Sequence, residues 1–138
     1  MTMRFAPDKD FGSYSVHSYQ AGHVKLIVPM DPAEKTLQPE ELTLTRSFII
    51  TPKQLQEDWP PQSLGELTTE HLQAVIDLNP ELVILGTGRT LEFPKSALTE
   101  SLLAKGIGVE IMDTAAACRT YNVLMHEGRE VAAALIVD

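Results

Sequence analysis

The sequence has little of what builds covalent cross-links, metal cages or membrane spans. It holds one cysteine, Cys118, which rules out an internal disulfide and a cysteine-based metal cluster. The longest uninterrupted apolar run, Val131 to Val137, has seven residues, far fewer than the roughly 20 of a membrane-spanning helix. Aromatic residues make up only 6% of the chain. Direct membrane insertion is therefore not expected.

Basic residues are also scarce: 11 stand against 19 acidic ones, which gives a net charge of −8. The imbalance is even, with 6 basic and 10 acidic residues in positions 1–70 and 5 and 9 in positions 71–138. A surface of this sign repels phosphate backbones, so nucleic acid is not an expected partner. The charge instead favours solubility.

The 138 residues are enough for one ordinary domain. Residues 1–13 are expected to be a flexible lead-in, and residues 14–138 a single α/β domain. The segment from Met1 to Phe11 has no apolar stretch of the kind found in secretory signals, so a cytoplasmic location is expected.

The first half predicts antiparallel strands. Apolar and polar residues alternate over Tyr14–Gln20, His23–Val28 and Leu42–Ile50, the pattern of half-buried strands. Arg46 interrupts the apolar face of the third segment, either because it extends to water at a sheet edge or because a bulge turns it outward. Between these strands and the second half, Thr51 to Leu67 is expected to be irregular.

The second half alternates strands with helices. The expected helices begin near Thr68, at Pro94 in the first helical position, and at Asp113 or Thr114, and the last two end at Gly106 and Gly128. The strands between them are Leu82–Leu85, Ile107–Met112 and Val131–Val137. This β-α-β-α-β order predicts a parallel arrangement with helices on both faces. The expected fold class is α/β: a single three-layer domain with a central mixed sheet.

Two short segments are candidates for a ligand site. Gly86, Thr87, Gly88 and Arg89 follow a buried strand, and Asp113 and Thr114 follow the next one. Ligands of open α/β sheets bind outside the carboxyl ends of parallel strands, and a helix N-terminus favours anions. A small carboxylate or phosphate is thus one hypothesis. The alternative is that Asp113 only caps the helix and Arg89 only pairs with Glu92 on the surface.

No pattern predicts an enzyme, a metal site or a cofactor. A dinucleotide motif is not complete, because Leu91 stands where its third glycine would be. Cys118 lies in an apolar helical stripe, which favours a core residue over a nucleophile. The four histidines do not occur at metal-ligand spacing.

A partner surface is the remaining candidate. Trp59, within a proline-rich segment, is either a core anchor or an exposed interface aromatic. Arg119, Asn122 and His126 share the polar face of the last expected helix, which is either solvated or a contact for a partner.

Several short motifs resemble a known family when taken in order. They are G-T-G at 86–88, M-D-T at 112–114, A-C-R-T-Y-N at 117–122 and E-G-R at 127–129. The resemblance is to a small-domain family of unknown function that includes the mitochondrial complex I assembly factor 3 and its bacterial and archaeal relatives. It implies a three-layer α/β domain and a role beside respiratory-complex proteins, and it brings no catalytic residues.

The sequence therefore predicts a non-catalytic interaction protein with protein partners. The resemblance implies that these partners are respiratory-complex subunits or assembly proteins. The alternative is a small-molecule binder or weak enzyme that uses the Gly86–Arg89 and Asp113–Thr114 segments. A homodimer through an edge strand or the Trp59 segment is a third hypothesis.

Overall fold

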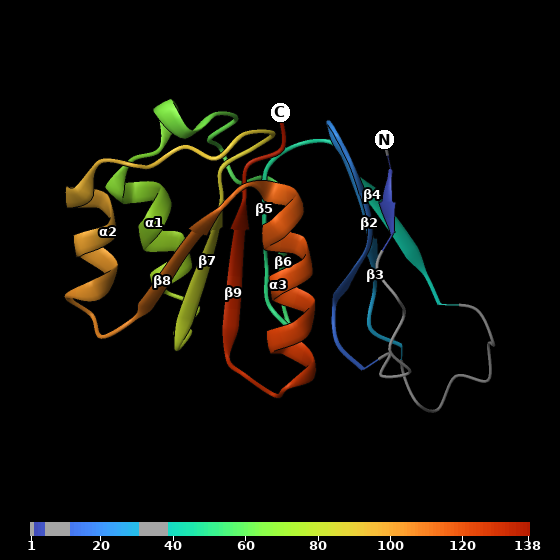
Figure 1. The fold of residues 1–138 in the computed structure, drawn as a ribbon. Coiled ribbons are helices and arrows are strands. Elements are labelled where there is room, and N and C mark those ends of the chain that lie inside the picture. The colour runs from blue at the N-terminus through green and yellow to red at the C-terminus, as the bar shows by residue number, and fades with distance from the viewer. Residues whose placement is uncertain (1, 5–11, 31–38) are drawn as a thin grey trace.

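The computed structural model describes residues 2–4, 12–30 and 39–138. These residues form an antiparallel sheet, a mixed sheet and three α-helices (Figure 1). The antiparallel sheet has the order β1-β2-β3-β4, with β1 Met3–Arg4, β2 Ser15–Gln20, β3 His23–Ile27 and β4 Glu41–Leu44. The mixed sheet has the order β6-β5-β9-β7-β8, with β5 Phe48–Ile50, β6 Leu55–Gln56, β7 Leu82–Gly86, β8 Gly108–Met112 and β9 Val131–Leu135.

The helices cover both faces of the mixed sheet. Helices α1 Thr69–Ile76 and α2 Ser96–Leu103 lie on one face, and α3 Thr114–His126 lies on the other, between the two sheets (Figure 1). A short 3₁₀ turn covers Leu64–Glu66. Strand β7 is parallel to β8 and β9, and β5 is antiparallel to β9. The predicted fold class is confirmed, although the N-terminal strands form a sheet of their own rather than part of the mixed one.

Each face of the mixed sheet has its own core. Strands β7 and β9 are buried along their whole length, as expected for central strands covered on both sides. Alternate residues of β7 point into different cores: Val83 packs with α1 and α2, and Ile84 packs with α3 and the antiparallel sheet.

Helix α3 follows the expected pattern closely. Asp113 is its N-cap, and the Asp113 side chain accepts a hydrogen bond from the Ala116 N–H at 2.8 Å. Gly128, at φ +79°, follows the C-cap residue Glu127. The apolar stripe through Cys118 is buried. Local sequence signals were sufficient here because both ends of the helix are set by neighbouring residues.

The expected strand Leu42–Ile50 is wrong as a single element. It is interrupted after Leu44, and its two parts, β4 and β5, belong to different sheets. Arg46 lies in the break and is exposed, which explains why it interrupts the apolar pattern. Ser47 fixes the break, because its buried Oγ accepts the Val137 N–H at 3.0 Å and its carbonyl accepts the Trp59 N–H at 3.1 Å.

Two expected boundaries also move. Pro94 is not the first helical residue, since α2 begins at Ser96 after Lys95 at the N-cap. The same helix ends at Leu103 with Ala104 as its C-cap, so the expected C-terminal glycine, Gly106 at φ +76°, stands two residues after the C-cap rather than directly after it. For the expected lead-in 1–13, Met3 and Arg4 pair with β2, and residues 1 and 5–11 lie outside the described part of the chain.

Candidate functional site

The two segments expected to form a ligand site do meet in space. Strand β7 ends at Gly86, β8 ends at Met112, and the two run parallel, so the residues after them emerge at one edge of the sheet. The Gly88 N–H donates to Thr114 Oγ1 at 2.8 Å, and the Thr114 N–H donates to the Gly88 carbonyl at 2.9 Å. We call this edge, made by residues 86–89, 113 and 114, the strand-end rim.

Thr114 is the centre of the strand-end rim and is fully buried. Its hydroxyl accepts from Gly88 and donates to the Ile136 carbonyl at 2.7 Å, so it joins the end of β7, the start of α3 and the segment after β9. Both hydrogen-bonding functions of this hydroxyl are therefore used within the chain. Its role in the structure is to fasten three elements together.

The two glycines of the rim allow the backbones to come this close. A Cβ on Gly86 would stand 2.8 Å from a Leu135 methyl and 3.0 Å from Thr114 Oγ1. Gly88 has φ +102°, and a Cβ there would stand 2.7 Å from the Asp138 carboxylate. The spacing G-T-G followed by D-T is thus explained by packing, without a ligand.

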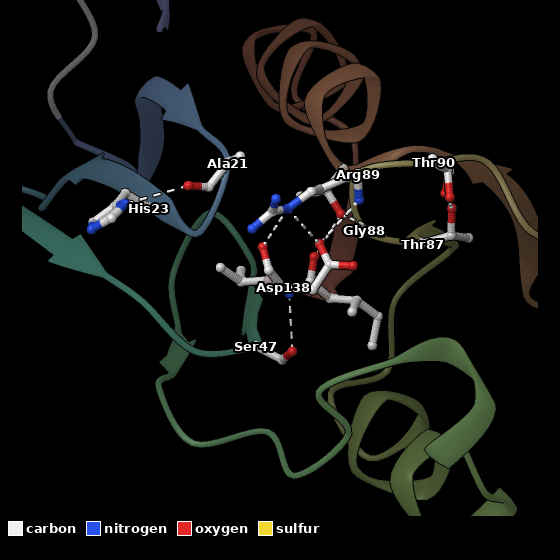
Figure 2. Close-up of polar contacts among 11 residues, drawn as sticks. Ala21, His23, Ser47, Thr87, Gly88, Arg89, Thr90 and Asp138 are labelled. Carbon is white, nitrogen blue, oxygen red and sulfur yellow. Dashed lines mark hydrogen bonds and ion pairs between the residues drawn. The ribbon is translucent and has the colours of Figure 1, made fainter. Parts of the chain in front are cut away.

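Arg89 faces a carboxylate of its own chain (Figure 2). The Arg89 N–H donates to Asp138 Oδ1 at 3.1 Å, and Arg89 Nε donates to the Asp138 backbone oxygen at 2.9 Å. Nε also lies 3.8 Å from Asp138 Oδ1. The expected partner, Glu92, is therefore wrong, because Asp138 takes its place. The rim accommodates a carboxylate, and in this structure the carboxylate comes from Asp138.

Thr87 is also used internally. Its hydroxyl donates to the Thr90 carbonyl at 2.7 Å and accepts the Glu92 N–H at 3.2 Å, which closes the turn after β7 (Figure 2).

Burial, followed by the negative charge of Asp138, raises the pKa of Tyr19 above its ordinary value. The Tyr19 phenol, which is protonated at neutral pH in any case, is therefore held still further from ionisation.

Cys118 does not have the setting of a nucleophile. It is fully buried in the core between α3 and the two sheets. Burial raises the pKa of its thiol far above the ordinary value, so the reactive thiolate is not formed near neutral pH. The interpretation of Cys118 as a core residue is confirmed.

Two of the four expected partner-surface residues are buried. Trp59 is 2% exposed, and its Nε1–H donates to the His71 carbonyl at 3.1 Å, so it is a core anchor and the interface alternative is wrong. Asn122 is 9% exposed. Its Oδ1 accepts the Val16 N–H at 2.9 Å and its Nδ2 donates to the Val16 carbonyl at 2.8 Å, so it binds β2 rather than a partner.

Arg119 remains exposed and His126 is half-buried, so only this part of the expected polar face reaches the surface. Helical periodicity could not separate Asn122 from them, because the antiparallel sheet packs against this side of α3. The neighbouring Tyr121 is used in the same way: its hydroxyl donates to the Tyr14 carbonyl at 2.7 Å. The A-C-R-T-Y-N motif thus attaches the antiparallel sheet to α3.

Sequence reasoning missed the exposed apolar side chains. In the described part of the chain, the large ones are Leu91, Phe93, Leu103 and Val123, and Phe93 is 74% exposed. Phe93 lines a groove of about 470 Å³ between the 3₁₀ turn and the start of α2, together with Leu64, Leu67 and Leu98. In the sequence, the position of Phe93 directly before Pro94 and outside the expected helix was the one indication that this aromatic side chain is exposed.

The described residues hold neither a cluster of metal-ligating side chains nor a membrane-spanning helix. Among residues 2–4, 12–30 and 39–138, no group of three or more His, Cys, Asp or Glu side chains is placed to hold a metal ion. Within the same ranges, none of the helices has both the length and the apolar character needed to cross a membrane.

Comparisons with known proteins lead to the same family as the resemblance of the motifs. Residues 18–136 match the family described as "Protein of unknown function (DUF498/DUF598)". The rat NADH dehydrogenase [ubiquinone] 1 alpha subcomplex assembly factor 3 is 41% identical over 80 residues, which are 56% of this chain and 43% of that protein. This chain thus spans less than half the length of that relative. A "13 kDa major membrane protein" of Francisella tularensis is 33% identical over 73 residues, 53% of this chain and 59% of that protein.

A solved structure covers nearly the whole chain. The NMR structure of the Xanthomonas campestris protein XCC1710 is 38% identical, with a TM-score of 0.74, and the match covers 98% of this chain and 92% of that one.

Proposed function

The chain belongs to the DUF498/DUF598 family of proteins of unknown function, and from that membership we propose that it is a non-catalytic interaction protein that assists the assembly of a respiratory-chain complex. The observation that carries the proposal is the 41% identity to a complex I assembly factor over 80 residues. Its partners in this proposal are respiratory-complex subunits or other assembly proteins.

The chemistry of the G-T-G, M-D-T and A-C-R-T-Y-N motifs supports a role without catalysis. In these motifs, the side chains of Thr114, Cys118 and Asn122 are buried and are bonded or packed within the chain. Buried residues of this kind stabilise the fold and do not act on a substrate. On the surface, Phe93 is 74% exposed beside an apolar groove, a setting that suits a contact with another protein. Exposed aromatic side chains of this kind supply much of the energy of protein interfaces.

A capture experiment tests the proposal. The tagged chain, expressed at its native level, is isolated at low salt from the cell that makes it, and bound proteins are identified by mass spectrometry. Enrichment of respiratory-complex subunits or assembly proteins is expected, and Phe93→Asp should lose them. Gln56→Asp, which adds the same charge at an exposed position of β6, is the matched control and should retain them. Recovery of no such protein by the wild-type chain would overturn the proposal.

Location is part of the same proposal. The chain acts in the cytoplasm, and its contact with a membrane complex passes through a partner protein, because a net charge of −8 opposes unspecific adsorption to anionic lipid. Cell fractionation tests this: the protein is expected in the cytoplasmic fraction, with a minor membrane-bound share that is released when the partner is absent.

A second candidate function, binding of a small anion at the strand-end rim, is favoured by one contact. Asp138 places a carboxylate against the Gly88 and Arg89 backbone and the Arg89 side chain. A free carboxylate that displaces Asp138 would meet the same donors. Thermal-shift measurements with small carboxylates and phosphates test it, since a ligand at 100 times its Kd stabilises a protein by about 2.7 kcal/mol. A shift that survives Arg89→Ala would exclude the rim as the site.

The homodimer hypothesis applies to either function. Size-exclusion chromatography with light scattering decides it, with a mass near 15.2 kDa for a monomer.

A further inference from the structure

The outer face of the antiparallel sheet carries a row of polar side chains that faces away from α3. Strand register places Arg4 opposite Ser18, Ser18 opposite Lys25, and Lys25 opposite Thr43, so the row crosses all four strands. A groove of about 490 Å³ lies over this row. His17 and His23 also line it. We call it the basic groove.

The basic groove contrasts with the rest of the molecule. The chain has a net charge of −8, but none of the described residues that line the groove is acidic. Arg4 and Lys25 supply two permanent positive charges, and the two histidines add charge when they are protonated. The hydroxyl of Ser18 lies between Arg4 and Lys25 in the row, and the hydroxyl of Thr43 lies on the other side of Lys25, so both can donate hydrogen bonds beside a cation.

One carboxylate borders the groove. A carboxylate oxygen of Glu41 lies 3.7 Å from Lys25 Nζ, and the other lies 4.0 Å from His17 Nε2. The side chains of this cluster are 31–44% exposed, and surface ion pairs of this kind contribute at most about 1 kcal/mol. An incoming anion therefore competes with Glu41 at little cost, and removal of Glu41 should strengthen its binding.

The strand is built so that His17 reaches this face. In a regular strand, consecutive side chains point to opposite faces, yet His17 and Ser18 both line the groove. The register of β2 against β3 shifts between Val16 and Ser18, which is the signature of a bulge, and bulges redirect side chains beside binding sites. Asn122 holds this irregularity by bonding both backbone groups of Val16. The nitrogen His17 Nδ1 is buried and has no hydrogen-bond partner in the described residues.

We propose that the basic groove is a binding site for a phosphate-class oxyanion, with Lys25 and Arg4 as the charged contacts and Ser18 and Thr43 as hydroxyl donors. A tetrahedral phosphate accepts several hydrogen bonds at once, which suits one lysine, one arginine and two hydroxyls in a row. The site is separate from the strand-end rim, and it depends neither on the partner-binding proposal nor on the rim proposal.

Titration of the full-length, isotope-labelled chain with inorganic phosphate tests the site. Backbone and histidine NMR signals are followed at constant ionic strength, with chloride as the balancing ion. Saturable shifts confined to β1–β4 are expected, with Lys25→Gln and Arg4→Gln each weakening Kd about tenfold. Glu41→Gln should tighten Kd severalfold. Lys53→Gln, which removes an exposed lysine outside the groove, should leave Kd unchanged. Unchanged spectra away from the groove confirm that each variant is folded.

A second experiment distinguishes a lipid headgroup from a soluble phosphorylated molecule as the ligand. Cosedimentation with phosphatidylcholine vesicles that contain phosphatidic acid, abolished by Lys25→Gln, would assign the site to a lipid headgroup. Phosphate binding without cosedimentation would assign it to a soluble phosphorylated molecule. Shifts that rise linearly with phosphate, or that persist unchanged in Lys25→Gln and Arg4→Gln, together with no vesicle binding, would overturn the proposal.

Discussion

The substitution Asn122→Ala tests how the two sheets are joined. In the native chain the Asn122 amide bonds both the N–H and the C=O of Val16, at 2.9 and 2.8 Å, and all these groups are buried. Alanine removes two hydrogen bonds and leaves two buried backbone groups without a partner. An unsatisfied buried polar group costs about 1–3 kcal/mol, so with two such groups the free energy of unfolding should fall by about 2–6 kcal/mol.

The assay is urea unfolding followed by circular dichroism, with thermal unfolding beside it. At about 4 °C per kcal/mol for a chain of this size, Tm should fall by roughly 8–24 °C. Arg119→Ala, an exposed change less than one turn earlier on α3, is the control and should stay within about 0.5 kcal/mol of the wild-type chain. A loss below about 0.5 kcal/mol for Asn122→Ala would refute the claim that this residue joins α3 to β2.

Three further outcomes are expected. Gly88→Ala should lower stability by about 1–3 kcal/mol in the same urea assay, because its φ is +102° and the new methyl would meet the Asp138 carboxylate. Gly128→Ala, where nothing lies within 4 Å, should cost less, and equal costs would exclude the clash. Because burial raises the pKa of Cys118, its thiol should stay protonated and react with a thiol reagent at pH 8 only after unfolding. Thr114→Val should cost about 2 kcal/mol through its two lost hydrogen bonds, and a neutral result would count against its fastening role.

Local signals in the sequence predicted the elements that local residues determine. The capping of α3 by Asp113, its end at Gly128 and the buried strand β7 all follow from short stretches of sequence. The same is true of Cys118, whose position in an apolar helical stripe indicated a core residue. The ends of α3 depend on contacts within a few residues, and the apolar patterns of β7 and α3 indicate which side chains are buried although distant elements cover them.

Contacts between distant residues decided what the sequence did not reveal. The alternation from Leu42 to Ile50 continues across the break at Ser47, and the break depends on bonds to Val137 and Trp59. Asn122 reads as a surface residue on a helical wheel, and only the packing of β2 on α3 buries it. The partner of Arg89 is 49 residues away, so no local pattern pointed to Asp138.

The strand-end rim shows both effects together. Its six residues were expected to meet, and parallel strand ends do bring Gly88 and Thr114 into contact. The internal use of the Thr114 hydroxyl could not be predicted, because its partners at Gly88 and Ile136 are backbone groups that the tertiary fold places. At this rim, the polar residues at the strand ends form a junction within the chain.

Quantification of the assembled respiratory complex tests the central claim most directly. In the cell that makes this protein, the gene is deleted, and the assembled NADH:ubiquinone oxidoreductase is measured on native gels by its in-gel activity. The account predicts that the assembled complex falls and subassemblies accumulate, and that the wild-type chain and Gln56→Asp restore it while Phe93→Asp does not. An unchanged amount of assembled complex after the deletion would contradict the account.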